Sequence, residues 1–464
     1  NEVVTIIICE GKPDIVINRF NHRTPGTTHG HHTSSAMLSV EAFDLVGDAS
    51  QYPKTAEAYG TWQPKRLFFN TSWWFYGSRE NFEKADKTNL VAVETGNYYP
   101  NLGLSNGEIA SLSRSMHKSQ GFGSTGSRGT QEEYLELLKG PLPKDKTNLF
   151  EGIDTSWSRL EGGKPIGDIL YSVENNFNFK DPSQHIPQLV EAYQLLSKLP
   201  DSHWKSIKLE ALSQLIGHCS GLYLEAVASE ASVVPGENVS ITIEAINRSG
   251  AKIALNAVQS AIVQSPTSLA PTPLTFNNPY QVSSVENTFN VNHFTTPYWL
   301  ESEGTLGMYK VTNPELIGTP ERPMPFPVTF SLTIEGKPIE ITKNITYKYN
   351  DPVKGEVYQP FEVLPVVTAS LPEKVTIFSN TNAKEIPVTV KAGKENITGT
   401  ITLQHPKGWI VKPSQHTFSL GRKGSSQTVV FSVTPPKDQA EGYVKPLMHV
   451  GDVFSDKELF EIDY

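Results

Sequence analysis

The feature that most constrains the fold is a change in hydrophobic periodicity near Leu222. Before it, short β-branched runs alternate with longer segments whose apolar residues have helical spacing, a pattern typical of α/β architecture and of helices. After it, short β-branched runs alternate with Pro, Gly and Asn turns at intervals of roughly 8–12 residues, which indicates antiparallel β-sandwiches. With 464 residues available, the sequence predicts a multidomain chain of about three or more cores.

The β-rich half divides into two predicted sandwiches, residues 222–350 and 351–464. Residues 239–246 alternate strictly between apolar and polar side chains, and Asp351–Glu356 has the composition of a linker between the two modules. In the second module, residues 386–391 and 397–403 form alternating strands, and Trp409 is expected to fill the core. Both modules resemble the immunoglobulin-like domains of bacterial carbohydrate-active enzymes, which implies a spacer or scaffold role.

Residues 14–46 of the α/β half predict a strand, a loop and a helix. Asp14–Asn18 is a β-branched run typical of a buried strand, and Thr33–Val46 has helical spacing. The loop between them contains Pro25 and Gly26. Four of the twelve histidines of the chain fall in this loop, namely His22, His29, His31 and His32.

His29 and His32 stand where the carboxyl end of a strand meets the amino end of a helix. Open α/β sheets bind ligands in that crevice. The positive end of the helix dipole disfavours imidazolium, and neutral imidazole is the form that binds zinc. A zinc site and a solvated, histidine-rich surface loop are both consistent with the spacing alone.

The run Thr-His-Gly-His-His-Thr-Ser-Ser-Ala (28–36), after a strand that ends in Asn18-Arg19, resembles the second histidine motif of the PIG-L/LmbE-like zinc-dependent N-deacetylases. In that family, the last histidine of this motif binds zinc and its first histidine faces the oxyanion. The resemblance therefore implies His32 as a zinc ligand and His29 as the catalytic oxyanion partner. His31 occupies the place where the family usually has Asp.

The first motif of that family, His-Pro-Asp-Asp-Glu, supplies two more zinc ligands and the base, and no His-Pro-Asp-Asp occurs in this chain. Asn1–Gly11 corresponds to the helix that precedes the second-motif strand. We therefore expect residues 1–130 to be the C-terminal part of a partial, Rossmann-like deacetylase domain. The remaining ligands and the base would lie upstream, and this chain alone would bind zinc weakly or not at all and be inactive.

Two further strands are predicted at residues 65–70 and 89–95. Between them, residues 73–76 read Trp-Trp-Phe-Tyr, and Tyr98 and Tyr99 follow the second strand. Aromatic side chains on loops beside strand ends can stack on sugar rings, or they can form a hydrophobic lid over the sheet. The sequence leaves both interpretations open.

Ser105 and Glu108 form a capping box that begins a helix running to about Lys118. Ile109, Leu112 and Met116 are its expected buried stripe. Polar and cationic residues beside the following glycine-rich loop suit a polyhydroxyl or anionic ligand, or else a solvated helix end. Residues 113–123 also resemble a stretch of large multidomain members of the deacetylase family. The expected substrate-binding residues are Arg19, Arg114, His117 and Lys118.

Residues 131–221 are predicted to be a helical region, with helices at 132–139, 166–176, 184–199 and 203–219. The net charge of −9 and the lack of a basic cluster argue against a nucleic-acid partner. No apolar run reaches about 18 residues, so no membrane span is expected. Cys9 and Cys219 are expected to be buried free thiols.

The resemblance implies a zinc-dependent deacetylase that acts on an N-acetylglucosaminyl-type sugar or glycoconjugate, with Zn²⁺ as cofactor. The alternative is a non-catalytic carbohydrate-binding or scaffolding protein with a degenerate deacetylase domain. The sandwich modules favour a periplasmic or extracellular location.

Overall fold

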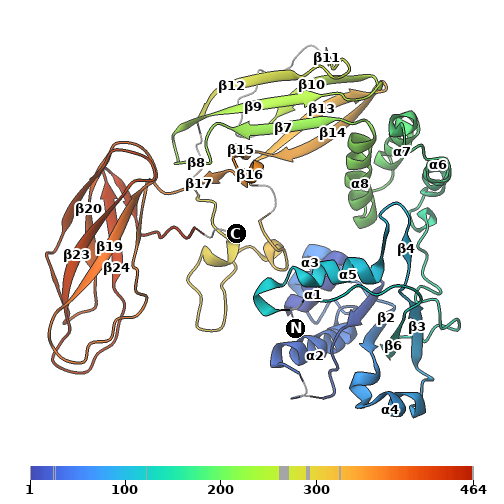
Figure 1. Ribbon diagram of the computed structural model, residues 1–464, viewed down its shortest axis with the longest axis horizontal. Helices are drawn as coiled ribbons and strands as arrows, with labels where there is room; N and C mark the ends of the chain where they lie inside the picture. Colours follow the sequence, from blue (N-terminus) through green and yellow to red (C-terminus); the bar gives the residue numbers. More distant parts are fainter. Residues whose placement is uncertain are drawn as a thin grey trace. The chain divides into compact units, whose positions relative to one another are not determined.

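The computed structural model describes residues 2–24, 26, 28–121, 123–260, 271–288, 293–322 and 325–461. Pro25 and Phe122, which belong to two of the predicted loops, lie outside these ranges. The chain is multidomain and forms two compact units (Figure 1). Unit 1 comprises Asn1–Arg159 with Ser302–Glu321, and unit 2 comprises Leu160–Glu301 with Arg322–Tyr464.

The centre of unit 1 is a four-stranded sheet with the order β1-β2-β6-β3. Its strands are β1 (Ile15–Asn18), β2 (Arg66–Thr71), β6 (Glu132–Lys139) and β3 (Leu90–Glu94). β1 and β2 are parallel, whereas β6 runs antiparallel to both β2 and β3. The predicted strands 14–18, 65–70 and 89–95 are confirmed. The sheet is mixed, in contrast to the parallel sheet of a Rossmann-like domain.

The predicted helix at 132–139 is wrong, because this segment is β6, an inner strand of the sheet. Its glutamates and leucines have good helix propensity, but packing overrides that preference. Leu135 is buried in a cluster with Phe68 and Val91, while Tyr134 packs on Phe82 from the other face. The α/β sheet therefore continues into the segment that the sequence assigned to the helical region 131–221.

The helices of unit 1 are α1 (Glu2–Gly11), α2 (Gly30–Leu45), α3 (Pro53–Tyr59), α4 (Arg79–Lys84) and α5 (Asn106–Ser115). α1 and α2 share a small core that includes Ile8, Cys9 and Ala42. The opposite face of the sheet is covered by residues 140–153, which the buried Arg66 holds. Its guanidinium donates to the carbonyls of Pro141, Leu149 and Glu151.

The capping box of α5 is confirmed, but its expected buried stripe is wrong. Ile109, Leu112 and Met116 are 36%, 60% and 70% exposed. The buried residue of this helix is Ser111, whose hydroxyl donates to the carbonyl of Ser124. A small side chain is needed there because the loop after the helix packs back along it.

Unit 2 begins with the helices α6 (Lys164–Asn175), α7 (Ile186–Ser197) and α8 (His203–Cys219), which confirms three of the four predicted helices. Two sheets follow. One has the order β12 (Tyr280–Thr288), β9 (Asn238–Ile246), β7 (Tyr223–Ala228), β15 (Thr346–Asp351) and β16 (Gly355–Pro360). The other has the order β11 (Thr272–Pro273), β10 (Ile253–Gln259), β13 (Pro327–Ile334) and β14 (Lys337–Asn344).

The predicted linker at 351–356 is wrong, because it is the turn of the hairpin β15–β16. The backbone N–H groups of Val353 and Lys354 both donate to a carboxylate oxygen of Asp351, and Gly355 follows with a φ of +82°. Turn residues therefore mark a hairpin here instead of a domain boundary. β17 (Glu362–Val363) then pairs with β8 (Ser232–Val233).

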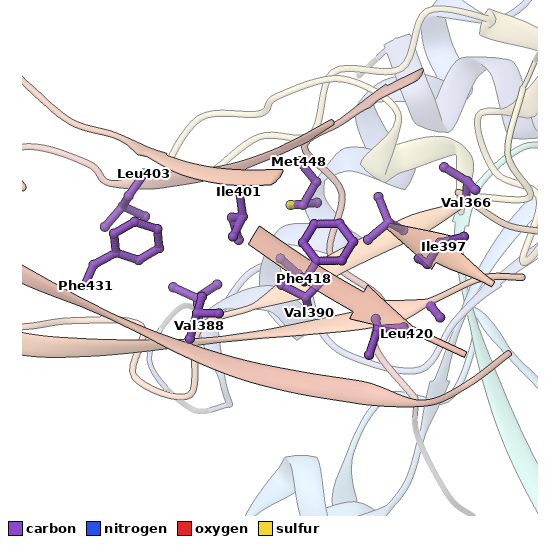
Figure 2. Close-up of a cluster of buried hydrophobic side chains, with 14 of the residues drawn as sticks. Val366, Val388, Val390, Ile397, Ile401, Leu403, Phe418, Leu420, Phe431 and Met448 are labelled. Atoms are coloured by element: carbon purple, nitrogen blue, oxygen red, sulfur yellow. The ribbon is translucent and has the colours of Figure 1, made fainter. Parts of the chain in front are cut away.

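The last two sheets enclose one hydrophobic core (Figure 2). One sheet contains β18 (Val367–Ser370), β19 (Lys384–Ala392), β23 (Ser426–Thr434) and β21 (Ile410–Lys412). The other contains β22 (His416–Leu420), β20 (Ile397–Gln404), β24 (Lys445–Val450) and β25 (Val453–Ser455). Val388 and Phe431 of the first sheet share this core with Ile401 and Met448 of the second, and the alternating strands predicted here are confirmed. Trp409 is only partly buried and packs at the margin of this core.

Both cysteines are free and buried, as expected. Among the described residues, no helix is long and apolar enough to cross a membrane.

Candidate metal centre

The candidate site begins at the carboxyl end of β1, where Asn18 ties the strand to helix α2. The Asn18 side chain is buried, and its amide donates to the carbonyl of Ala36 at 3.3 Å. The hydroxyl of Ser39 donates to the amide oxygen of Asn18 at 2.6 Å. These two bonds fix the helix over the sheet face that carries Asn18, so that the loop before the helix lies at the carboxyl edge.

α2 begins at Gly30, three residues before the predicted start, with His29 as its N-cap. His29 has extended backbone angles (φ −61°, ψ 144°), and its side chain makes no capping hydrogen bond. The imidazole of His29 therefore does not cap the helix, and its ring nitrogens remain able to bind a metal ion. His31 and His32 lie in the first helical turn, so all three rings come from four consecutive residues.

The structure brings His29, His31 and His32 together. One ring nitrogen from each lies within 4.8 Å of the others. The ring centroids of His29 and His32 are 5.6 Å apart, and those of His31 and His32 are 4.0 Å apart. In the part of the chain that the structure describes, this is the only group of three or more His, Cys, Asp or Glu side chains that could hold a metal ion.

The donor set of this cluster fits a zinc ion. Zn–N bonds of about 2.0–2.1 Å in a tetrahedral site place the nitrogens about 3.4 Å apart. The three nitrogens lie within 4.8 Å of one another, and His29 and His31 are exposed, so side-chain rotation can bring them to this spacing. If all three imidazoles bound the ion, one tetrahedral position would stay open, as in catalytic zinc sites, and if only two bound it, the third would be free to contact a substrate.

The surroundings of His32 favour the neutral imidazole, which is the metal-binding form. Its ring stacks on Phe20, with centroids 4.0 Å apart and planes 13° from parallel. This partial desolvation, together with the neighbouring His31 and His29, lowers the pKa of His32. The expectation of a neutral imidazole was based on the helix dipole, whereas desolvation and neighbouring rings are the causes found here.

The fourth histidine of the loop, His22, is not part of the cluster. Its neighbour Arg23 forms a bidentate ion pair with Glu136 of β6, at 2.7 and 3.4 Å, and this pins the loop to the sheet. Desolvation, followed by the charge of Arg23, lowers the pKa of His22. One of its ring nitrogens is buried without a hydrogen-bond partner among the described residues. His22 thus packs against the sheet, while the other three histidines face the rim.

Arg19 is engaged with the neighbouring strand. Its guanidinium donates to the side chain of Asn70 on β2 at 2.7 Å, and Asn70 donates to Glu133 of β6 at 2.9 Å. These three polar side chains form a chain along the carboxyl edge of the sheet. Arg19 lies on the same edge as the histidines, but its described hydrogen bond is to Asn70.

Arg114, His117 and Lys118 are exposed at the end of α5 and in the short turn after it. They come from a different element from the histidine cluster, and the three imidazoles converge without them. The nearby glycines have a structural explanation. A Cβ on Gly107 would lie 2.1 Å from the hydroxyl of Ser127, and one on Gly126 would lie 2.8 Å from the Glu108 side chain. These glycines let the loop pack against the helix.

The aromatic run 73–76 is split by the structure. It forms a short 3₁₀ turn directly after β2, in which Phe75 packs on the buried Phe69 and Tyr76 packs on Phe82. Trp73 and Trp74 remain 42% and 55% exposed. Phe75 and Tyr76 therefore help to cover the sheet, whereas the side chains of Trp73 and Trp74 remain accessible to a ligand.

A cavity of about 690 Å³ lies elsewhere in unit 1. Its lining includes Asp14 and Lys65, which precede β1 and β2, so it opens at the amino ends of these strands. The ion pair between Arg159 and Asp14, at 2.6 and 2.9 Å, lies in its wall. The histidine cluster is therefore an exposed site at the opposite edge of the sheet.

Sequence reasoning missed His31, because the family motif has Asp in its place. The three histidines are close in the sequence, but neighbouring positions of a helix do not face one another, so this spacing alone does not predict that their rings converge.

Comparison with known proteins identifies no family for this chain. No family model matches the chain, and no curated protein matches it. A red sea bream transglutaminase matches at 13% identity over 56% of this chain and 32% of its own, with a TM-score of 0.24. The Vibrio cholerae secreted serine protease VesC matches at 10% identity over 53% and 54%, with a TM-score of 0.16. The Yersinia pseudotuberculosis adhesin InvE matches at 10% identity over 51% and 58%, with a TM-score of 0.15.

This chain thus spans between 32% and 58% of the length of these solved proteins. Similarities of this size carry no argument about its fold or its function.

Proposed function

We propose that this protein is a zinc-dependent N-deacetylase acting on an N-acetylated sugar or glycoconjugate. The observation that carries the proposal is the convergence of His29, His31 and His32 at the amino end of a helix, on the carboxyl edge of the sheet. If these three imidazole rings had pointed away from one another, the proposal of a metal site would have had no basis. The substrate class comes from the family resemblance of residues 18–46 and 105–123.

In this proposal His32 holds the metal and His31 reaches the same position. When bound, zinc lowers the pKa of water to about 7 and polarises the amide carbonyl. His29 keeps an N–H that it donates to the oxygen of the attacked carbonyl as negative charge develops there. Contacts of this type commonly contribute about 3 kcal/mol to transition-state stabilisation.

The candidate cluster contains no carboxylate among the described residues. The proposed reaction also needs a general base and further ligands, which the resemblance assigns to a His-Pro-Asp-Asp-Glu motif that these 464 residues do not contain. Arg19, Arg114, His117 and Lys118 are proposed to contact the sugar or its substituents, since all four are exposed in unit 1.

The test has two stages. Zinc titration of this chain followed by calorimetry should show one site, weakened at least tenfold by His32→Ala and by His31→Ala. His405→Ala, at an exposed histidine of unit 2, is the control and should bind as the natural chain does. Absence of zinc binding, or binding unaffected by His32→Ala, would refute the metal site.

The second stage measures acetate release from an N-acetylglucosamine oligosaccharide by the longest natural form of the protein. Zinc-dependent release that His29→Ala lowers by two orders of magnitude is expected. A protein that binds zinc but releases no acetate would contradict the enzyme assignment.

The second candidate is a non-catalytic carbohydrate-binding or scaffolding protein, favoured by the lack of a carboxylate in the described cluster. Oligosaccharide binding without acetate release would support it. In either case, we propose that the two β-rich modules of unit 2 are immunoglobulin-like spacers and that the protein acts in the periplasm or outside the cell.

A further inference from the structure

The exposed tryptophans Trp73 and Trp74 stand on a rigid support. Trp74 packs edge-on against Phe75 at 4.9 Å, and Phe75 packs edge-on against Phe69 at 4.8 Å. Phe69 is only 1% exposed and belongs to the centre of the sheet. The indole of Trp74 is thus coupled through two rings to the core, although it remains more than half exposed.

The turn that carries both tryptophans is closed at its end. Gly77 ends the turn in the left-handed conformation, with a φ of +82°, and the hydroxyl of Ser78 caps helix α4 by accepting from the Asn81 N–H. The guanidinium of Arg79 lies over the ring of Trp73, 5.4 Å from its centroid. An exposed aromatic pair held this firmly loses little conformational entropy when it binds a ligand.

The tryptophan pair and the histidine cluster are attached to neighbouring residues of the sheet. Asn18 of β1 holds α2, and Phe69 of β2 holds the turn 73–76. In the parallel register of the two strands, Asn18 is directly opposite Phe69. Both segments leave the carboxyl ends of adjacent strands and fold over the face of the sheet that carries this pair, and Figure 1 shows β2 leading toward α4.

We propose that Trp73 and Trp74 form a carbohydrate-stacking subsite beside the histidine cluster, for an oligosaccharide of equatorially substituted pyranoses. The faces of such rings present C–H groups that pack on indole, and the guanidinium of Arg79, which lies over Trp73, has N–H groups that can donate to sugar hydroxyls. The inference rests on the proposed function for the acetylated unit, which would sit at the histidines. The neighbouring sugar units would lie on the tryptophans, so the substrate is a chain of sugars.

The test uses calorimetric titration of this whole chain, freed of metal with a chelator, with chitotetraose. Trp74→Ala should weaken binding about tenfold and Trp74→Phe by less than about threefold, because the phenyl ring retains a stacking face. Tyr443→Ala removes a 94% exposed ring from unit 2 and should change nothing. Cellotetraose lacks acetamido groups but has the same pyranose faces. Trp74→Ala should therefore weaken its binding about as much as it weakens the binding of chitotetraose.

Three outcomes would overturn the inference. These are no oligosaccharide binding by the natural chain, equal binding by Trp74→Ala and the natural chain, and self-association that Trp74→Ala abolishes, which would assign this surface to a second copy. Trp74-dependent binding without zinc binding would refute the proposed enzyme but retain the subsite. Zinc-dependent deacetylation that is unaffected by Trp74→Ala would support the proposed enzyme but refute the subsite.

Discussion

The tether between β1 and α2 gives the sharpest test of how this site is built. Asn18 and Ser39 are each only 8% exposed, and together they make two hydrogen bonds across the strand–helix contact, at 2.6 and 3.3 Å. A net contribution of about 1 kcal/mol per bond, with a further cost for a buried hydroxyl that loses its best partner, gives about 2–3 kcal/mol for Asn18→Ala.

Ser39→Ala should cost about 1–2 kcal/mol, because it leaves the Asn18 amide oxygen without the Ser39 hydroxyl. The double variant should be less destabilised than the sum of the two single variants by about 1 kcal/mol, since both changes remove the same bond. Hydrogen exchange of the β1 and α2 amides reports this locally, which avoids treating a multidomain chain as a two-state system.

The same variants separate stability from metal binding. All three imidazoles come from residues 29–32, so zinc affinity should change by less than about threefold when Asn18 is replaced, whereas His32→Ala should weaken it at least tenfold. Unchanged exchange in Asn18→Ala, or strictly additive effects of the two changes, would refute the reasoning about the tether.

Three further predictions concern other parts of the chain. The pKa of His22 is lowered in the folded state, so the unfolded state takes up a proton first and stability falls as the pH drops below about 6.5; urea unfolding at several pH values should show that His22→Gln removes this component. The side chain of Glu225 is 9% exposed and pairs with Lys348 at 2.6 Å. Glu225→Ala should therefore lower the free energy of unfolding by about 3 kcal/mol, and faster hydrogen exchange of the β7 and β15 amides would report it. Leu112→Ser and Met116→Ser should each change stability by less than about 0.5 kcal/mol in thermal unfolding, because both side chains are exposed. A loss of about 2 kcal/mol would instead support the sequence-based prediction that these side chains are buried.

The elements around the candidate site were predictable because their signals are local. A β-branched run, a capping box and a helical period act within one or two turns of chain, and β1, α5 and α2 follow them closely. The three histidines are also close in the sequence, but neighbouring helical positions do not face one another, so the convergence of their rings is seen only in the structure. The sequence by itself therefore determined most of the strands and helices, and it placed three histidines at the start of α2.

The pairing partners of these elements were decided only by the tertiary structure. The segment 132–139 has a helix-favouring composition but becomes an inner strand, because Leu135 packs with Phe68 and Val91 from distant parts of the chain. The apolar residues of α5 stay exposed because the following loop, and not the sheet, covers this helix. Which rings are buried in the run 73–76 was likewise set by Phe69 and Phe82. Local sequence carries backbone preference, whereas burial depends on neighbours that only the folded chain brings into contact.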